Sequence, residues 1–173
     1  MTSLASAELK SPQILHFAFD PKKRAASCSE PIWKDRIDRW YQLDETSFAL
    51  CDAIASWQEG HKLKSFDEMV FLSLNGSNLA DAEFVATRPA SPSKFVYTLS
   101  NIGPSVASHL LKWAGPVFCY CPASDAEHAF ALKLAIQTAY AKLDRDGVKT
   151  LILAAIPRLN EKGYRDVYGY FIS

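Results

Sequence analysis

Hydrophobic and polar positions along the chain form two patterns: short apolar runs, and longer segments with a helical repeat. The runs predict strands at 14–19, 69–74, 95–99, 117–121 and 150–156, and a last strand between 166 and 172. The helical repeat predicts helices at 45–59, 78–85, 102–113 and 124–144. Strands that alternate with helices indicate an α/β fold with a mixed, mostly parallel sheet flanked by helices.

Local signals support several of these boundaries. Asp44 is a good N-cap for the helix at 45–59, and Gly60 ends it. The helix at 124–144 carries apolar residues around much of its surface, so we expect it to be central and buried. The segment 22–31 has no periodicity and is predicted to be a loop. The segment 32–41 fits either a short amphipathic helix or an aromatic-rich arm.

Length and charge limit the classes of function. The 173 residues fit a single domain, with residues 1–11 as a loose polar lead. Nineteen basic and nineteen acidic residues cancel, so no overall field attracts the chain to nucleic acid or to an anionic membrane. The longest apolar run is too short to span a bilayer, and the first ten residues have no signal-peptide pattern. We therefore expect a cytoplasmic protein.

The four cysteines are Cys28, Cys51, Cys119 and Cys121. In a strand, Cys119 and Cys121 point to the same face and could share a metal. No second Cys or His pair with ligand spacing accompanies them, so no metal site is predicted. We interpret the cysteines as reduced thiols that pack in the protein interior.

The richest chemistry lies where the strand 117–121 meets the following helix. Gly115-Pro116 precedes the strand, and a Pro-Ala-Ser-Asp corner follows it. This corner places Ser124 at a helix N-terminus, where unpaired N–H groups favour negative charge. A sharp strand–turn–helix corner is how several enzyme families present a nucleophile. Ser124 is therefore the candidate nucleophile.

The span from Phe95 to Ile156 resembles the N-terminal half of a β-ketoacyl synthase, which has a thiolase-like fold. The residues that carry the resemblance are Leu99-Ser100-Asn101, the helix that contains Ala107, Gly115-Pro116, Ala123-Ser124, Ala129, Ala135 and the strand 151–156. In that family an Ala-Cys pair at the corner supplies the nucleophilic cysteine, and this position falls on Ser124. The resemblance implies a truncated thiolase-like half, with residues 1–173 forming one synthase-like N-terminal domain.

Two departures from the family pattern bear on catalysis. A serine hydroxyl is hardly ionised at neutral pH and needs a neighbouring base. The family's two decarboxylation histidines lie in a C-terminal half that this sequence does not contain. His128, one helical turn after Ser124, is the candidate base among the four histidines. The corner is therefore predicted to be a former nucleophile site without confident catalytic residues.

The chain is also similar to the chain-length factors, synthase-like subunits that lack the cysteine. The resemblance implies a non-catalytic subunit that forms a heterodimer with a full-length ketosynthase and shapes its acyl pocket. The pathway would be polyene, polyketide or fatty-acid-like biosynthesis, with an acyl carrier protein as a second candidate partner and no cofactor. The predicted tunnel-wall or interface residues are Phe118, Tyr120, Phe130 and Leu134.

Two other functions remain open from the sequence. The chain could be a small serine acyltransferase or hydrolase that uses Ser124 with His128 as base and Asp125 or Glu127 nearby. It could instead be a binding module of unrelated α/β fold. Its interface would then be marked by the aromatic residues Trp33, Trp40, Tyr41 and Trp57.

Overall fold

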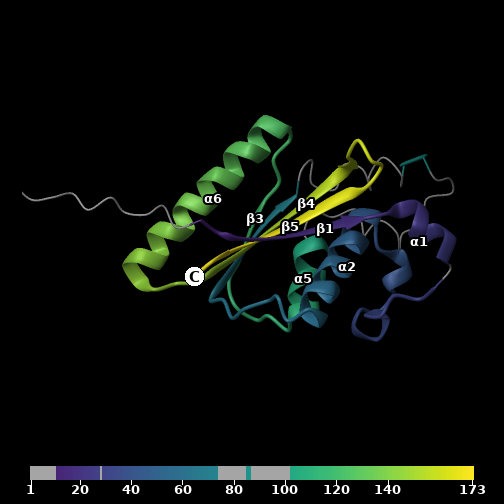
Figure 1. The fold of residues 1–173 in the computed structure, drawn as a ribbon, viewed down its shortest axis with the longest axis horizontal. Coiled ribbons are helices and arrows are strands. Elements are labelled where there is room, and N and C mark those ends of the chain that lie inside the picture. Colours follow the sequence, from purple (N-terminus) through teal and green to yellow (C-terminus); the bar gives the residue numbers. More distant parts are fainter. Residues whose placement is uncertain (1–10, 28, 74–84, 87–101) are drawn as a thin grey trace, which may run out of the picture.

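The fold is built on a five-stranded sheet with the strand order β1-β5-β4-β2-β3 (Figure 1). The computed structural model describes residues 11–27, 29–73, 85–86 and 102–173. The strands are β1 (Gln13–Phe19), β2 (Glu68–Ser73), β3 (Val117–Tyr120), β4 (Thr150–Leu159) and β5 (Arg165–Ile172). β3, β2 and β4 are parallel neighbours, and β5 is antiparallel to both β4 and β1. Among the described strands, β5 alone runs against the others, so the mixed, mostly parallel sheet is confirmed.

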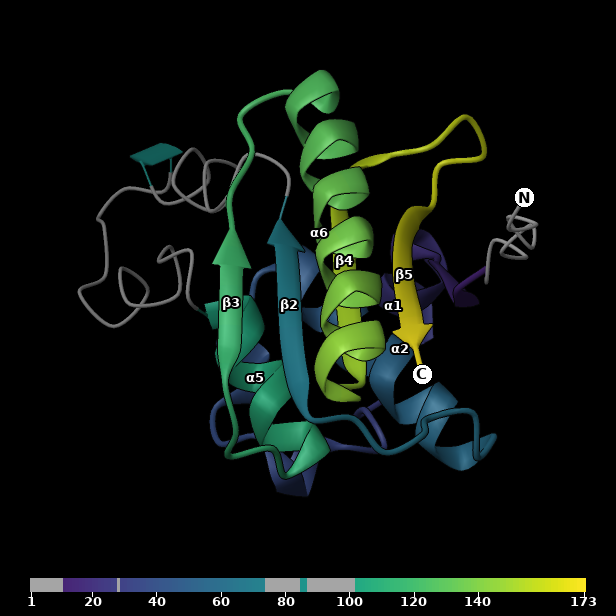
Figure 2. The same cartoon turned by 90° about the vertical axis from the view of Figure 1, so that its left-hand side faces the viewer.

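Helices cover both faces of the sheet, but unequally. The described helices are α1 (Pro21–Ser27), α2 (Glu45–Glu59), α5 (Ile102–Leu111) and α6 (Asp125–Asp146), with two short 3₁₀ turns, η1 (Lys34–Arg36) and η2 (Trp40–Gln42). α2 and α5 lie on one face, and α6 lies on the opposite face (Figures 1 and 2). The chain therefore has a layer of helices, a sheet, and then one further helix.

The α2 face holds the larger core, and its local structure follows the sequence. Asp44 accepts hydrogen bonds from the N–H groups of Thr46 (2.9 Å) and Ser47 (3.0 Å). Gly60 ends α2 as predicted. α2 buries a continuous side against β1, β4 and β5, together with α5. Most of its apolar surface is thus removed from water within this one chain.

Trp57 of α2 packs directly on the backbone of β5. A Cβ atom at Gly169 would lie 3.2 Å from the Trp57 ring, which is tighter than an ordinary contact, so any other residue there would require the ring to shift by a few tenths of an ångström. Trp33 is also buried, and its Nε1–H donates to Asp52 Oδ1 at 2.7 Å. The prediction that Trp33 and Trp57 mark an interface is therefore wrong. Tyr41 is the exposed member of that group.

α6 is the only described helix on its face of the sheet, and its predicted burial is wrong. Of its residues, only Ala135 and Ala139 are buried, and Phe130 is 69% exposed. The two alanines pack on Val70 and Ile152 in a small second cluster. Five strands are about 24 Å wide, whereas a helix is about 10 Å wide. A single helix therefore cannot cover the sheet, and no described layer of this chain covers the helix.

Three segments differ from the sequence expectations. Residues 22–27, part of the loop predicted at 22–31, belong to α1. Asp20 Oδ1 accepts from the N–H groups of Lys22 (3.0 Å) and Lys23 (3.1 Å), and Pro21 occupies the first helical position. The segment 32–41 forms η1 and the start of η2 rather than an α-helix. β4 continues to Leu159, with a register shift after Ala155 that accommodates Pro157.

Some expectations fall outside the described residues. These are the polar lead at 1–10, most of the helix at 78–85, and the strand at 95–99. The helix predicted at 102–113 is confirmed from Ile102 to Leu111, with Val106 and Leu110 buried as expected.

Candidate functional site

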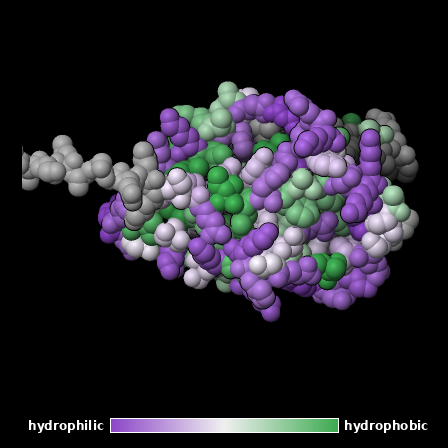
Figure 3. Space-filling model, in the orientation of Figure 1, coloured by the Kyte–Doolittle hydropathy of each residue, from purple (hydrophilic) through white to green (hydrophobic). Residues whose placement is uncertain are grey.

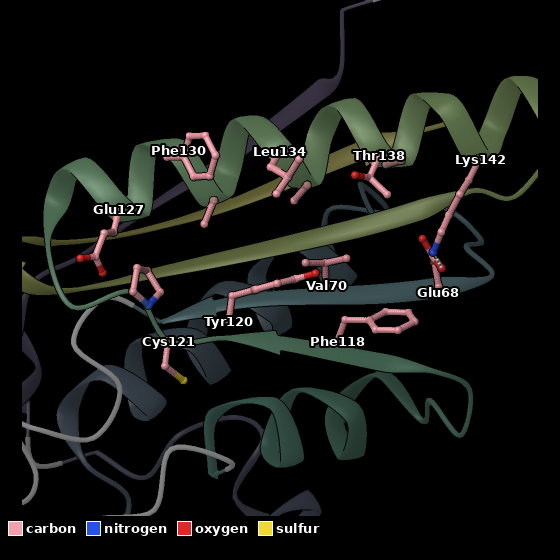
Figure 4. A pocket seen from close by; sticks show the side chains of 14 residues that line it. Glu68, Val70, Phe118, Tyr120, Cys121, Glu127, Phe130, Leu134, Thr138 and Lys142 are labelled. Carbon is pink, nitrogen blue, oxygen red and sulfur yellow. Dashed lines mark hydrogen bonds and ion pairs between the residues drawn. The ribbon is translucent and has the colours of Figure 1, made fainter.

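A groove of about 490 Å³ runs between α6 and the edge strand β3 (Figure 4). It is lined by Glu68, Val70, Phe118, Tyr120, Cys121, Pro122, Glu127, Phe130, Ala131, Leu134, Ala135, Thr138, Ala139 and Lys142. Most of these residues are apolar. Figure 3 shows the molecule from the other side, on which β1 lies in front, and there hydrophobic side chains lie among hydrophilic surroundings. The groove itself has a mainly apolar lining. Such a lining suits an apolar ligand or partner.

Two periodicities create the groove. In the sheet register, Phe118 and Tyr120 of β3 lie opposite Val70 and Leu72 of β2. Val70 and Leu72 pack against α6. Because side chains alternate along a strand, all four side chains therefore lie on the α6 side of the sheet. On α6, residues four positions apart share one side, so Phe130, Leu134 and Thr138 form a row above the strand (Figure 4).

The structure thus brings together the four residues predicted to form a tunnel wall or interface. Phe118 is 43% exposed, Tyr120 and Leu134 are each 47% exposed, and Phe130 is 69% exposed. Large apolar side chains are seldom gathered at such exposure on one surface unless that surface binds something. Their role in a tunnel or an interface stays a prediction.

A polar cluster lies at one end of the groove. Lys142 Nζ lies 2.6 Å from Glu68 Oε2, and Thr150 Oγ1 donates to Glu68 Oε1 at 2.9 Å. Glu68 is only 7% exposed, so its charge requires these partners. The Lys142 ammonium also lies 4.8 Å from the centre of the Phe118 ring, within range of a cation–π interaction.

The Ser124 corner lies at the other end. Ser124 is exposed and is the N-cap of α6, where its Oγ accepts from the Glu127 N–H at 3.3 Å. Glu127 Oε2 in turn accepts from the Ala123 N–H at 2.8 Å. Asp125 forms an ion pair with Arg158. These polar groups therefore hold the start of α6, and they resemble a capping box more than a catalytic triad.

His128 lies half-buried in the first turn of α6. Its Nε2 is buried and has no hydrogen-bond partner among the described residues. Burial lowers the pKa of the ring below its ordinary value, so the imidazole is neutral at pH 7. A general base must lie within hydrogen-bond reach of its nucleophile. In the described part of the chain, the His128 backbone N–H donates to the Ser124 carbonyl at 2.9 Å, but no hydrogen bond joins the two side chains. The catalytic roles of both residues stay predictions.

The cysteines differ from expectation. Cys51 is buried as expected, but Cys119 and Cys121 are exposed because β3 is an edge strand. Partial burial raises the pKa of Cys119, and nearby Cys121 raises it further, so the thiol form dominates. Cys28 lies outside the described residues. Within the described ranges, no group of three His, Cys, Asp or Glu residues is arranged to hold a metal ion.

Sequence reasoning missed the polar cluster at the end of the groove. The available signal was an acidic residue, Glu68, at the start of an otherwise apolar strand. Its partner Lys142 lies 74 residues further along the chain, so only the fold brings the two together.

None of the helices in the described segments is both long and apolar enough to cross a membrane.

A comparison with solved structures identifies a protein of similar fold. The chain superimposes on a chain of the complex between a ketosynthase (ApeO) and its chain length factor (ApeC) from Xenorhabdus doucetiae, with a TM-score of 0.58. The match covers 94% of this chain and 78% of that chain, at 16% sequence identity. No family model and no curated protein matches the sequence. The chain therefore has a ketosynthase-like, thiolase-like fold.

Proposed function

We propose that the chain is a non-catalytic, ketosynthase-like subunit that pairs with a full-length ketosynthase. In this role it resembles a chain-length factor and shapes the partner's acyl pocket. The assembly would act in the cytoplasm, in polyene, polyketide or fatty-acid-like biosynthesis, and would receive its substrate from an acyl carrier protein. The observation that carries the proposal is the exposed apolar groove between β3 and α6, on a fold shared with a ketosynthase–chain length factor complex.

The position of β3 supports pairing with another chain. β3 is the last strand in the described sheet order, so one of its edges has no described strand beside it. An edge strand with exposed apolar side chains readily adds another chain. Phe118 and Tyr120 lie on this strand and remain nearly half exposed. Covering them would remove apolar area from water, which favours association.

The groove supports the role in shaping an acyl pocket. Its wall combines the side chains of β3 with those of Phe130, Leu134 and Ala131 of α6. Among the described lining residues, none between Glu127 at one end and the pair formed by Glu68 and Lys142 at the other is charged (Figure 4). An alkyl chain in this groove would contact mainly apolar groups along most of its length.

The arrangement at Ser124 supports a non-catalytic subunit. The Ser124 hydroxyl caps α6, and Asp125 and Glu127 are each engaged elsewhere. A serine nucleophile needs a base that is itself oriented by a third group. His128 has no such orienting partner among the described residues.

Native mass measurement tests the proposal. The chain is purified alone and after co-expression with a candidate ketosynthase, and a one-to-one complex is expected. Phe118→Asp or Tyr120→Asp should abolish or strongly weaken the complex, because each would place a charge in an apolar contact. Tyr41→Asp is the matched control, since Tyr41 is equally aromatic, 68% exposed and belongs to η2. It should leave the complex intact.

Two results would contradict the proposal. One is a chain that stays monomeric in the presence of every ketosynthase from its own genomic neighbourhood. The other is labelling of Ser124 by an acyl-phosphonate probe, lost in Ser124→Ala and in His128→Gln. That second result would favour the serine acyltransferase or hydrolase instead.

A further inference from the structure

We propose that Lys142, held in place by Glu68, ends the groove and limits the length of the apolar chain that it accepts. This inference rests on the proposed function, because it takes an acyl chain as the ligand of the groove. It assigns a specificity-determining role to a pair of residues that lies far from the Ser124 corner, at the opposite end of α6.

The geometry of α6 sets the scale of the groove. From Glu127 to Lys142 the helix rises about 22 Å, and the row of Phe130, Leu134 and Thr138 lies between them (Figure 4). A chain that enters near the Ser124 corner would pass these side chains and Tyr120, and would then reach Phe118. Beyond the Phe118 ring it meets the Lys142 ammonium, 4.8 Å from the ring centre. Methylene groups placed there would strip water from charged groups without replacing their interactions.

The lysine cannot swing aside easily. Glu68 is 7% exposed, and its carboxylate is compensated by Lys142 at 2.6 Å and by the Thr150 hydroxyl at 2.9 Å. Moving Lys142 away would leave a buried carboxylate without its counter-charge, which is strongly unfavourable. Glu68 itself is fixed at the start of β2, where it pairs with Thr150 of β4. The end of the groove is therefore a fixed stop and not a flexible side chain.

Two double variants separate the bulk of the lysine from its charge. Glu68→Gln with Lys142→Ala removes the stop, and Glu68→Gln with Lys142→Met keeps a side chain of similar length. Both avoid an unpaired buried charge, and the amide oxygen introduced at position 68 can still accept from the Thr150 hydroxyl. Lys133→Ala is the matched control, because Lys133 is exposed on the same helix and lies outside the groove. Folding of each variant is verified by circular dichroism and by its urea midpoint.

The probes are N-acetylcysteamine thioesters with saturated acyl chains of about six to sixteen carbons. The affinity of each thioester is measured by its displacement of a bound fluorescent naphthalene dye. The full chain is used alone and, where it forms, in the ketosynthase complex. Affinity should rise about fourfold per methylene and then stop rising at a definite length. The alanine double variant should move this limit upward by about four carbons, the length of the lysine stem. The methionine double variant should also move the limit upward, because its side chain has neither the charge nor the pairing with Glu68 that fixes Lys142. Lys133→Ala should keep the wild-type limit.

Each outcome decides the proposal. An unchanged limit in the alanine double variant would overturn it, while the subunit proposal would stand on the native mass of the complex. A wild-type limit in the methionine double variant would also overturn the inference, because the length of the side chain, without the pairing to Glu68, would then set the limit. If no thioester binds the chain or its complex, the groove is not an acyl site and the inference fails. Failure of the subunit proposal is scored separately, by the absence of the complex.

Discussion

The two faces of the sheet carry different amounts of structure. On the α2 face, α2 and α5 enclose a core that includes Trp33, Trp57 and Leu110, each at most 2% exposed. On the other face, α6 contributes only Ala135 and Ala139 as buried residues, and aromatic side chains beside them stay exposed. Within the residues that the structure describes, the sheet is thus covered on one face and only partly covered on the other. Apolar surface on the first face stabilises the fold, whereas on the second it is available for binding.

The largest effect that would test this comparison is the loss of a core aromatic. Trp57→Ala should lower the free energy of unfolding by about 3–5 kcal/mol, because it leaves a cavity between α2 and β5. Phe130→Ala, which removes a large aromatic side chain from the other face, should change it by less than about 0.5 kcal/mol. Urea unfolding followed by circular dichroism measures both. Equal losses would mean that the α6 face is as fully packed as the α2 face.

A medium effect is expected at the helix caps. Asp44 accepts two backbone hydrogen bonds and one from the Ser47 hydroxyl (2.6 Å), so Asp44→Ala should cost about 1–2 kcal/mol. Ser124 accepts a single bond at 3.3 Å and is exposed, so Ser124→Ala should cost about 0.5 kcal/mol. Thermal unfolding of the two variants gives the comparison. A larger loss for Ser124→Ala would show that the corner carries more of the fold than its hydrogen bond indicates.

The smallest effect is a pH dependence from His128. Burial lowers the pKa of His128 in the folded chain below its ordinary value of about 6.5, so between the two pKa values the unfolded chain binds the extra proton. Stability contributed by the neutral ring is therefore present above pH 6.5 and declines as the pH falls towards the folded pKa. Unfolding midpoints from about pH 7.5 to 5 should fall more for the wild type than for His128→Gln. Parallel curves for the two proteins would contradict this.

Local signals in the sequence predicted most of the fold. The cap at Asp44, the stop at Gly60 and the apolar runs of β2, β4 and β5 each lie within a few residues of the structure. The helix α1 could also have been predicted, because Asp20 followed by Pro21 is a strong N-cap and N1 pair. The absence of periodicity at 22–31 instead indicated a loop.

Burial was harder to predict than helicity. The apolar residues of α6 indicated a buried helix, yet burial depends on what lies opposite, and nothing in a single sequence states how many layers cover a face. The same limit explains Cys119 and Cys121, whose exposure follows from the place of β3 at the sheet edge. The candidate site was likewise only partly predictable. Strand alternation predicted that Phe118 and Tyr120 share one face, whereas the pairing of Glu68 with Lys142 could be seen only in the fold.

The strand order also has a consequence for how the protein is made. β4 and β5 join β1 to β2, yet they are encoded after residue 149 and emerge from the ribosome after the other described strands. Until they appear, β1 has no neighbour among the described strands and the apolar run of β2 has only the four residues of β3 beside it. Until β4 and β5 are made, the early strands expose unpaired backbone groups and apolar side chains, which makes the incomplete chain prone to aggregation.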